Sequence, residues 1–151
     1  MRVRDVLRRV SVDAVMTRSP VTLELNATLS DAAELFLAGR FRHLPVVTAQ
    51  RHLAGMLSER DLRSRLGAEP SAFLDATLEA LDEPVSEAMT PDPLYVRAGA
   101  PLAEVLPLFA DEGVGAVAVL DHSDRLVGIV SYVDIIRFLR TQAAEQPASA
   151  G

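Results

Sequence analysis

Short segments that either alternate apolar and polar positions or form apolar runs bounded by polar turns recur along the chain, in two groups that have the same order. The first group predicts a strand, a helix, two further strands and a second helix. Thr28 and Asp31 have the spacing of a capping box at the start of the first helix, and Gly67 is placed to end the second. The predicted strands are 21–25, 43–48 and 53–58, and the predicted helices are 28–38 and 59–66.

The second group repeats this order further along the chain. Its predicted strands are 94–96, 116–120 and 126–131, and its predicted helices are 102–111 and 132–140. Pro107 lies inside the first of these helices. A proline there removes a backbone donor and costs roughly 3 kcal/mol if the helix continues through it, so we expect this helix to kink or to end early.

The remaining segments divide the chain into five parts. An amphipathic stretch over 73–81 predicts one helix within the connector, and the Ala, Gln and Ser residues of the last segment, with Pro147, predict a disordered tail. We therefore expect an N-terminal extension, a first repeat, a linker with a helix, a second repeat and the tail. Their boundaries are 1–10, 11–66, 67–83, 84–140 and 141–151.

The two groups are copies of one sequence unit. When the chain is shifted against itself by 73 residues, Met16 and Thr17 fall on Met89 and Thr90. The segment Gly-Met-Leu-Ser-Glu-Arg-Asp-Leu at 55–62 falls without a gap on Gly-Ile-Val-Ser-Tyr-Val-Asp-Ile at 128–135. The chain is therefore an internal duplication.

Composition excludes several classes of chemistry. The 151 residues contain no cysteine, which rules out disulfides, thiolate nucleophiles and thiolate zinc sites, and a reducing cytoplasm is the expected location. All 15 basic residues are arginine, so no lysine can serve as a Schiff-base or phosphate-loop residue. A net charge of -6 and the lack of a long apolar run argue against nucleic-acid and membrane partners.

Each sequence repeat is too small to bury its own sheet face. We therefore expect a mixed α/β (α+β) fold in which the two repeats pack sheet to sheet around a pseudo-twofold axis. Such packing would leave matching clefts between the repeats.

The motifs resemble those of a tandem pair of CBS domains, the Bateman module. The resemblance rests on the Met-Thr openings, on Phe-Arg-His-Leu-Pro-Val-Val at 41–47 and on the Gly-x-x-Ser-x-x-Asp segment that closes each copy. It implies a regulatory module that binds AMP, ADP or ATP, or less commonly S-adenosylmethionine or NAD, in clefts between the repeats. It also implies a homodimer and requires no cofactor.

The chemistry of the closing segments agrees with such a ligand. A strand that turns directly into a helix presents free N–H groups and a positive dipole end to an anion. Asp61 and Asp134 have two acceptor oxygens each, which suit the hydroxyls of a ribose, while Met56 and Ile129 can pack against a purine. The complete set of predicted ligand-binding residues is Arg42, His43, Met56, Ser58, Arg60, Asp61, Ile129, Ser131 and Asp134.

Two features leave alternatives open. Ser-x-x-Asp at a helix start is also a capping box that needs no ligand, and both roles can coexist. Arg42, His43 and Arg60 have Gly115, Ala116 and Val133 as their counterparts, so the two clefts are not expected to be equivalent. Arg42 and Arg60 could equally form a solvated surface pair.

These observations support a stand-alone sensor that binds an adenosine nucleotide and signals to a separate protein by a change of shape. The alternative is a ligand-free dimerisation or assembly module. An enzyme is not expected, because no nucleophile with its base can be assembled from these residues. The three histidines lack metal-ligand spacing, so no metal site is expected.

Overall fold

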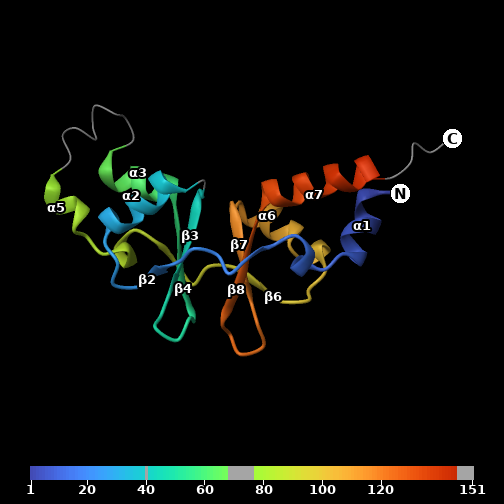
Figure 1. Ribbon diagram of the computed structural model, residues 1–151, viewed down its shortest axis with the longest axis horizontal. Coiled ribbons are helices and arrows are strands. Elements are labelled where there is room, and N and C mark those ends of the chain that lie inside the picture. Colours follow the sequence, from blue (N-terminus) through green and yellow to red (C-terminus); the bar gives the residue numbers. More distant parts are fainter. Residues whose placement is uncertain (40, 68–76, 146–151) are drawn as a thin grey trace. The chain divides into compact units, whose positions relative to one another are not determined.

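The computed structural model describes residues 1–39, 41–67 and 77–145 of the chain. These residues form two compact units that interleave along the sequence. Unit 1 contains Met1–Ser19, Leu94–Ser123 and the chain from Val127 on, and unit 2 contains Pro20–Pro93 and Asp124–Leu126. Each unit has a four-stranded sheet with helices, which confirms the predicted mixed α/β fold (Figure 1).

Unit 2 has the strand order β2-β3-β4-β5. Strands β2 and β3 are parallel, and the other two pairs are antiparallel. Its strands are β2 (Leu23–Glu24), β3 (His43–Val47), β4 (Leu53–Ser58) and β5 (Thr90–Pro91). Its helices are α2 (Leu29–Ala38), α3 (Glu59–Leu66), α5 (Leu78–Leu81) and the 3-10 turn η2 (Val85–Glu87).

Unit 1 has the strand order β1-β8-β7-β6. Its strands are β1 (Thr17–Arg18), β6 (Tyr95–Arg97), β7 (Ala116–Leu120) and β8 (Leu126–Ser131). Its helices are α1 (Val3–Arg9), α6 (Leu106–Glu112) and α7 (Tyr132–Glu145), with 3-10 turns η1 (Val12–Ala14) and η3 (Leu102–Glu104).

Each unit takes one edge strand from the start of the other sequence repeat. Strand β1 comes before the first repeat's strands, yet it pairs with β8, where Thr17 lies opposite Ile129. Strand β5 comes before the second repeat's strands, yet it pairs with β4, where Thr90 lies opposite Met56. The two sequence repeats therefore exchange equivalent strands, and each exchanged strand belongs to the sheet that it joins.

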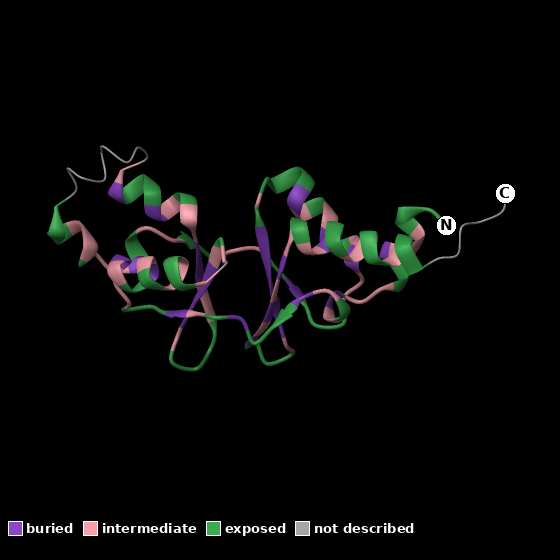
Figure 2. Ribbon diagram, turned by 45° about the horizontal axis from the view of Figure 1, so that its top comes forward, coloured by how far each residue is buried: buried purple, intermediate pink, exposed green. Residues whose placement is uncertain are grey.

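Both cores lie between a sheet face and its helices, as the burial colours show (Figure 2). In unit 2, Leu44, Val46 and Leu57 point into the core and are fully buried. Side chains alternate across a strand, so His43, Pro45 and Met56 lie on the opposite face of that sheet. Val117, Val119 and Val130 hold the equivalent core positions in unit 1.

Most of the predicted elements are confirmed, and some to the residue. Strands β4, β7 and β8 and helix α3 have the predicted bounds. The helix expected over 102–111 is interrupted, because η3 ends at Glu104 and α6 starts a new helix with Pro107 in its first turn. A proline is tolerated there, since first-turn N–H groups have no partner within the helix.

The predicted tail and the predicted connector helix each lie partly within the described residues. The prediction of a disordered tail from Thr141 is wrong for its first five residues, since α7 continues to Glu145. Ala, Gln and Glu favour helix, and the Thr141 hydroxyl donates to the Arg137 carbonyl oxygen at 3.1 Å. Of the connector helix expected over 73–81, residues 73–76 lie outside the described part of the chain, and Leu78–Leu81 is helical.

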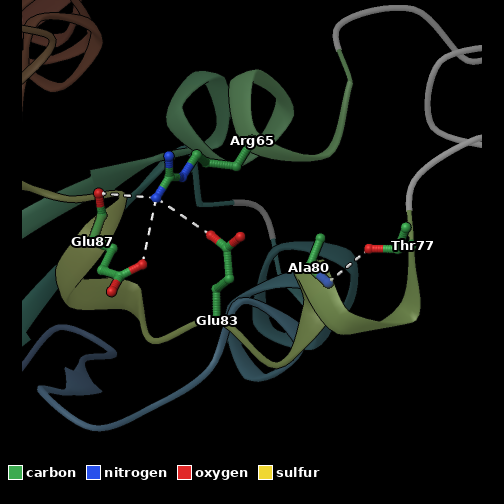
Figure 3. A network of polar contacts seen from close by, with 5 residues as sticks. All are labelled: Arg65, Thr77, Ala80, Glu83 and Glu87. Atoms are coloured by element: carbon green, nitrogen blue, oxygen red, sulfur yellow. Dashed lines mark hydrogen bonds and ion pairs between the residues drawn. The ribbon is translucent and has the colours of Figure 1, made fainter.

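The end of the connector is tied to α3 by one arginine (Figure 3). The Arg65 guanidinium lies 3.3 Å from a carboxylate oxygen of Glu83 and 3.7 Å from one of Glu87, and it donates to the Glu87 carbonyl oxygen at 3.5 Å. Thr77 caps α5 through the Ala80 N–H. The C-terminal end of α3 therefore holds the segment that leads into β5.

Candidate functional site

The junction between β4 and α3 is built as a reciprocal cap. The Ser58 N–H donates to Oδ2 of Asp61 at 2.8 Å, and the Asp61 N–H donates to Oγ of Ser58 at 3.0 Å. Ser58 keeps extended backbone angles, so the chain turns from strand to helix within one residue. Both side chains are partly buried, which holds this geometry in place.

The junction between β8 and α7 has the same construction. The Ser131 N–H donates to Oδ2 of Asp134 at 2.8 Å, and the Asp134 N–H donates to Oγ of Ser131 at 3.1 Å. The duplicated motif therefore forms the duplicated hydrogen-bond pair, one in each unit.

The caps leave a defined set of groups for a ligand. Oδ1 of Asp61 and Oδ1 of Asp134 accept no hydrogen bond from the described residues, because each cap uses Oδ2. At the start of α3 the Glu59 N–H already donates to the Arg42 carbonyl oxygen at 2.9 Å. The Asp61 N–H donates to Ser58, so of the first three N–H groups of α3 only that of Arg60 remains for an anion. This helix end can therefore bind a phosphate through fewer N–H groups than the sequence suggested.

Several predicted residues of the first repeat gather around this junction. His43 lies directly opposite Ser58 in the β3–β4 pair, and Pro45 lies opposite Met56. All four therefore face the same side of the sheet, away from the helix core. Met56 is 7% exposed, so its side chain is buried at this face of the sheet.

The structure changes the ionisation of His43. Burial lowers the pKa of His43 below its usual value of 6.5, the nearby Asp61 carboxylate opposes this shift, and the Arg42 guanidinium adds to it. The desolvation effect is the largest of the three. The imidazole is therefore held neutral near pH 7, able to donate from one nitrogen and accept at the other.

The two arginines lie at the surface of unit 2. Arg42 has an 80% exposed side chain and lies 3.8 Å from a carboxylate oxygen of Glu59. Glu59 is also 3.9 Å from Arg63, one helical turn further along. Arg60 is exposed and forms no ion pair within the described residues. Exposed pairs of this kind hold their members weakly, so Arg42 can be drawn away by a stronger anion.

In unit 1 the equivalent positions are apolar. Ala116 and Ala118 are buried where His43 and Pro45 stand in unit 2, and Ile129 is half-buried. Val133, the counterpart of Arg60, is 57% exposed. The cap of Asp134 is preserved while the cationic groups around it are missing. This unit carries the predicted ligand residues Ile129, Ser131 and Asp134, and unit 2 carries the other six.

Sequence reasoning missed three residues that the fold brings to these junctions. Glu59 competes for Arg42, and its sequence signal was the four-residue spacing to Arg63. Thr90 and Thr17 lie opposite Met56 and Ile129 on the exchanged strands. The repeated Met-Thr pair was visible in the sequence, but the strand next to which it lies was not.

Within the described residues, no group of three or more His, Asp or Glu side chains has the arrangement of a metal site. Over the same residues, no helix is long and apolar enough to cross a membrane.

A protein-family model described as CBS domain matches this chain twice, over residues 3–68 and 85–141. Among curated relatives, a CBS domain-containing protein of Dictyostelium discoideum is 33% identical over 136 residues, which is 87% of this chain and 92% of that protein. An uncharacterized 33.4 kDa protein of Thermofilum pendens is 38% identical over 106 residues, 66% of this chain. The match spans only 35% of the Thermofilum protein.

Solved structures share the fold. A protein of Vibrio cholerae described as a putative acetoin utilization protein has a TM-score of 0.73 and 32% identity, and the match covers 91% of this chain and 98% of that one. CBSX2 in complex with AMP has a TM-score of 0.74 at 24% identity, with 88% and 98% covered. The CBS domain pair of MJ0100 from a complex with 5'-methylthioadenosine and S-adenosyl-L-methionine has the same TM-score and coverage at 23% identity.

Proposed function

The chain belongs to the CBS domain family, and from this membership we propose that it is a regulatory CBS pair that binds an adenosine nucleotide. In this proposal the ligand lies against the strand-to-helix junctions. Binding changes the shape of the module, and a separate protein responds to that change. The module itself catalyses no reaction, acts in the cytoplasm and works as a homodimer.

The observation that carries this proposal is the pair of matching caps. Each cap orients one aspartate through Oδ2 and leaves Oδ1 without a partner in the described residues. An oriented carboxylate oxygen suits the vicinal hydroxyls of a ribose, and the capping bonds lower the entropy lost when the ligand binds. Related structures that contain AMP or S-adenosyl-L-methionine support an adenosine-type ligand.

The neighbouring residues suggest how the rest of the ligand is held. In unit 2, Met56 can pack against a purine, and Thr90 lies opposite Met56 in the β4–β5 pair. Arg42, Arg60 and the Arg60 N–H are the groups available for phosphate, and neutral His43 can hydrogen-bond to the ligand. We propose that the first repeat takes the more highly charged ligand, because the second repeat lacks these cations.

A second function has its own support. Both serine–aspartate pairs are already satisfied as caps, and they would form without any ligand. Helix α7 also exposes Tyr132, Val133 and Ile136, which are 51%, 57% and 44% accessible. A ligand-free assembly module would use such residues to bind another chain.

Thermal melting against AMP, ADP, ATP, adenosine, S-adenosylmethionine and NAD, with GTP as control, separates these functions. A ligand at 100 times its dissociation constant adds about 2.7 kcal/mol to the free energy of unfolding. For a chain of this size that is a rise in Tm of roughly 5 to 10 °C. A flat response to every adenosine compound, together with a stable dimer in sedimentation, would establish the assembly module instead.

The ribose contact has its own comparison. We expect 2′-deoxy-AMP to bind more weakly than AMP, because the Asp61 carboxylate loses one hydroxyl partner. Equal affinities for AMP and 2′-deoxy-AMP in isothermal titration would contradict the assigned role of Asp61. They would not contradict the proposal that the chain binds an adenosine nucleotide.

A further inference from the structure

Unit 1 contains an open groove that the proposed nucleotide site does not use. Its volume is about 950 Å³, within the range of roughly 300–1,000 Å³ that is usual for small-molecule sites. Helix α1, η3, α6, the turn after α6 and the first residue of α7 line it. Ser131 and Asp134 are not among its lining residues.

The floor of the groove is apolar. Leu7 is 3% exposed and Phe109 is 9% exposed, so both are held firmly by the core of unit 1. Leu106 and Val114 are half-buried beside them and also line the groove. The Tyr132 ring packs edge-on against Phe109, with centroids 5.9 Å apart, and adds an aromatic wall.

Two cations lie along one side of this floor. Arg4 and Arg8 are separated by four residues on α1, so they share a helix face, and both line the groove. Within the described residues neither forms an ion pair. Asp111 is the one carboxylate in the lining. The groove therefore carries a net charge of one positive unit.

We propose that this groove binds a small amphiphilic carboxylate, a molecule with an apolar body and a single negative head group. The apolar body lies on Leu7, Phe109 and Tyr132, and the carboxylate accepts paired N–H bonds from the arginines. A monoanion matches the net charge, whereas a phosphate dianion would face uncompensated repulsion from Asp111. None of the predicted nucleotide-binding residues lines the groove, which reaches the β8–α7 junction through Tyr132.

Three probes of one shape test the charge requirement. Isothermal titration is run on the full chain with 2-naphthoate, neutral 2-naphthalenemethanol and cationic 2-naphthylmethylamine. We expect the order naphthoate, alcohol, amine, with naphthoate at least ten-fold tighter than the alcohol. Equal affinity for naphthoate and the alcohol, or no binding of naphthoate at millimolar concentration, would overturn the proposal.

Matched variants locate the site. The double variant R4Q/R8Q should lose about ten-fold in naphthoate affinity and leave the affinity for the alcohol unchanged. The control R2Q/R9Q removes the same charge from the N-cap and the last turn of α1, at positions outside the groove. It should behave like the unmodified chain, and an equal loss in this control would overturn the proposal.

A filling variant separates a ligand from a second copy of the chain. Ala110 is exposed on α6, so Ala110→Trp fills the groove without entering the core, and it should abolish binding of both naphthoate and the alcohol. Circular dichroism checks that this variant folds. If Ala110→Trp instead dissociates a dimer in sedimentation while naphthoate does not bind the unmodified chain, the groove is an interface between copies and the proposal is wrong.

Discussion

The side chain of Met16 fills the space beside Gly128 that a Cβ at position 128 would need. A Cβ built there would lie 2.9 Å from Cγ of Met16, and Sδ is closer still. The duplicate pair is arranged in the same way, with Cγ of Met89 2.8 Å from a Cβ at Gly55. Each Met-Thr segment is thereby held against the glycine-containing strand of the other sequence repeat.

We expect Gly128→Ala to lower the free energy of unfolding by roughly 1–3 kcal/mol, because the buried Met16 side chain must leave its position. Urea denaturation measures the change. The double variant with Met16→Ala should show a smaller loss than the sum of the two single variants, since truncation of Met16 makes room for the new methyl group. Additive losses would show that the two residues do not interact.

Asp61→Ala should abolish nucleotide binding at the first repeat and lower stability by about 1 kcal/mol through loss of its cap. The matched control is Asp31→Ala, because Asp31 closes the same kind of capping box with Thr28 at the start of α2, with bonds of 2.9 and 3.2 Å. Asp31→Ala should cost similar stability and leave the affinity for AMP unchanged in isothermal titration. A similar loss of affinity in both variants would assign Asp61 a purely structural role.

Arg42→Ala should weaken binding of ATP by about ten-fold or more and that of adenosine hardly at all, since a charge-assisted hydrogen bond to phosphate contributes about 1.5–3 kcal/mol. The control is Arg63→Ala, because Arg63 is the other exposed partner of Glu59. That variant should keep both affinities. Equal loss for ATP and adenosine after Arg42→Ala would contradict the assigned phosphate contact.

Stability should fall as the pH is lowered through the usual His range, and His43 should account for part of the fall. Burial lowers the pKa of folded His43 below the unfolded value of 6.5, so the unfolded chain binds the proton more readily. This contribution is complete above pH 6.5 and is lost as the pH decreases below it. Denaturation of His43→Gln between pH 5 and 8 should show a shallower dependence than that of His122→Gln, which changes an exposed residue. Identical slopes would contradict the assignment.

Local sequence patterns were enough to identify the duplication and to predict most of the helices and strands. The spacing of Ser58 and Asp61 specifies a cap whose bonds span three residues, and the apolar run over 53–58, bounded by polar turns, specifies a strand that was found with those bounds. Such features depend on neighbours in the sequence, so the sequence alone carries them. The interruption at Pro107 was predictable for the same reason.

Tertiary structure decided what depends on distant partners. No local signal indicates that Thr17 pairs with Ile129, that Met16 packs on Gly128, or that Arg4 lines a groove with Phe109. The lowered pKa of His43 likewise follows from its burial in the folded chain. Packing between segments far apart in the chain depends on which surfaces become buried together, and periodicity within a short window holds no information on that choice.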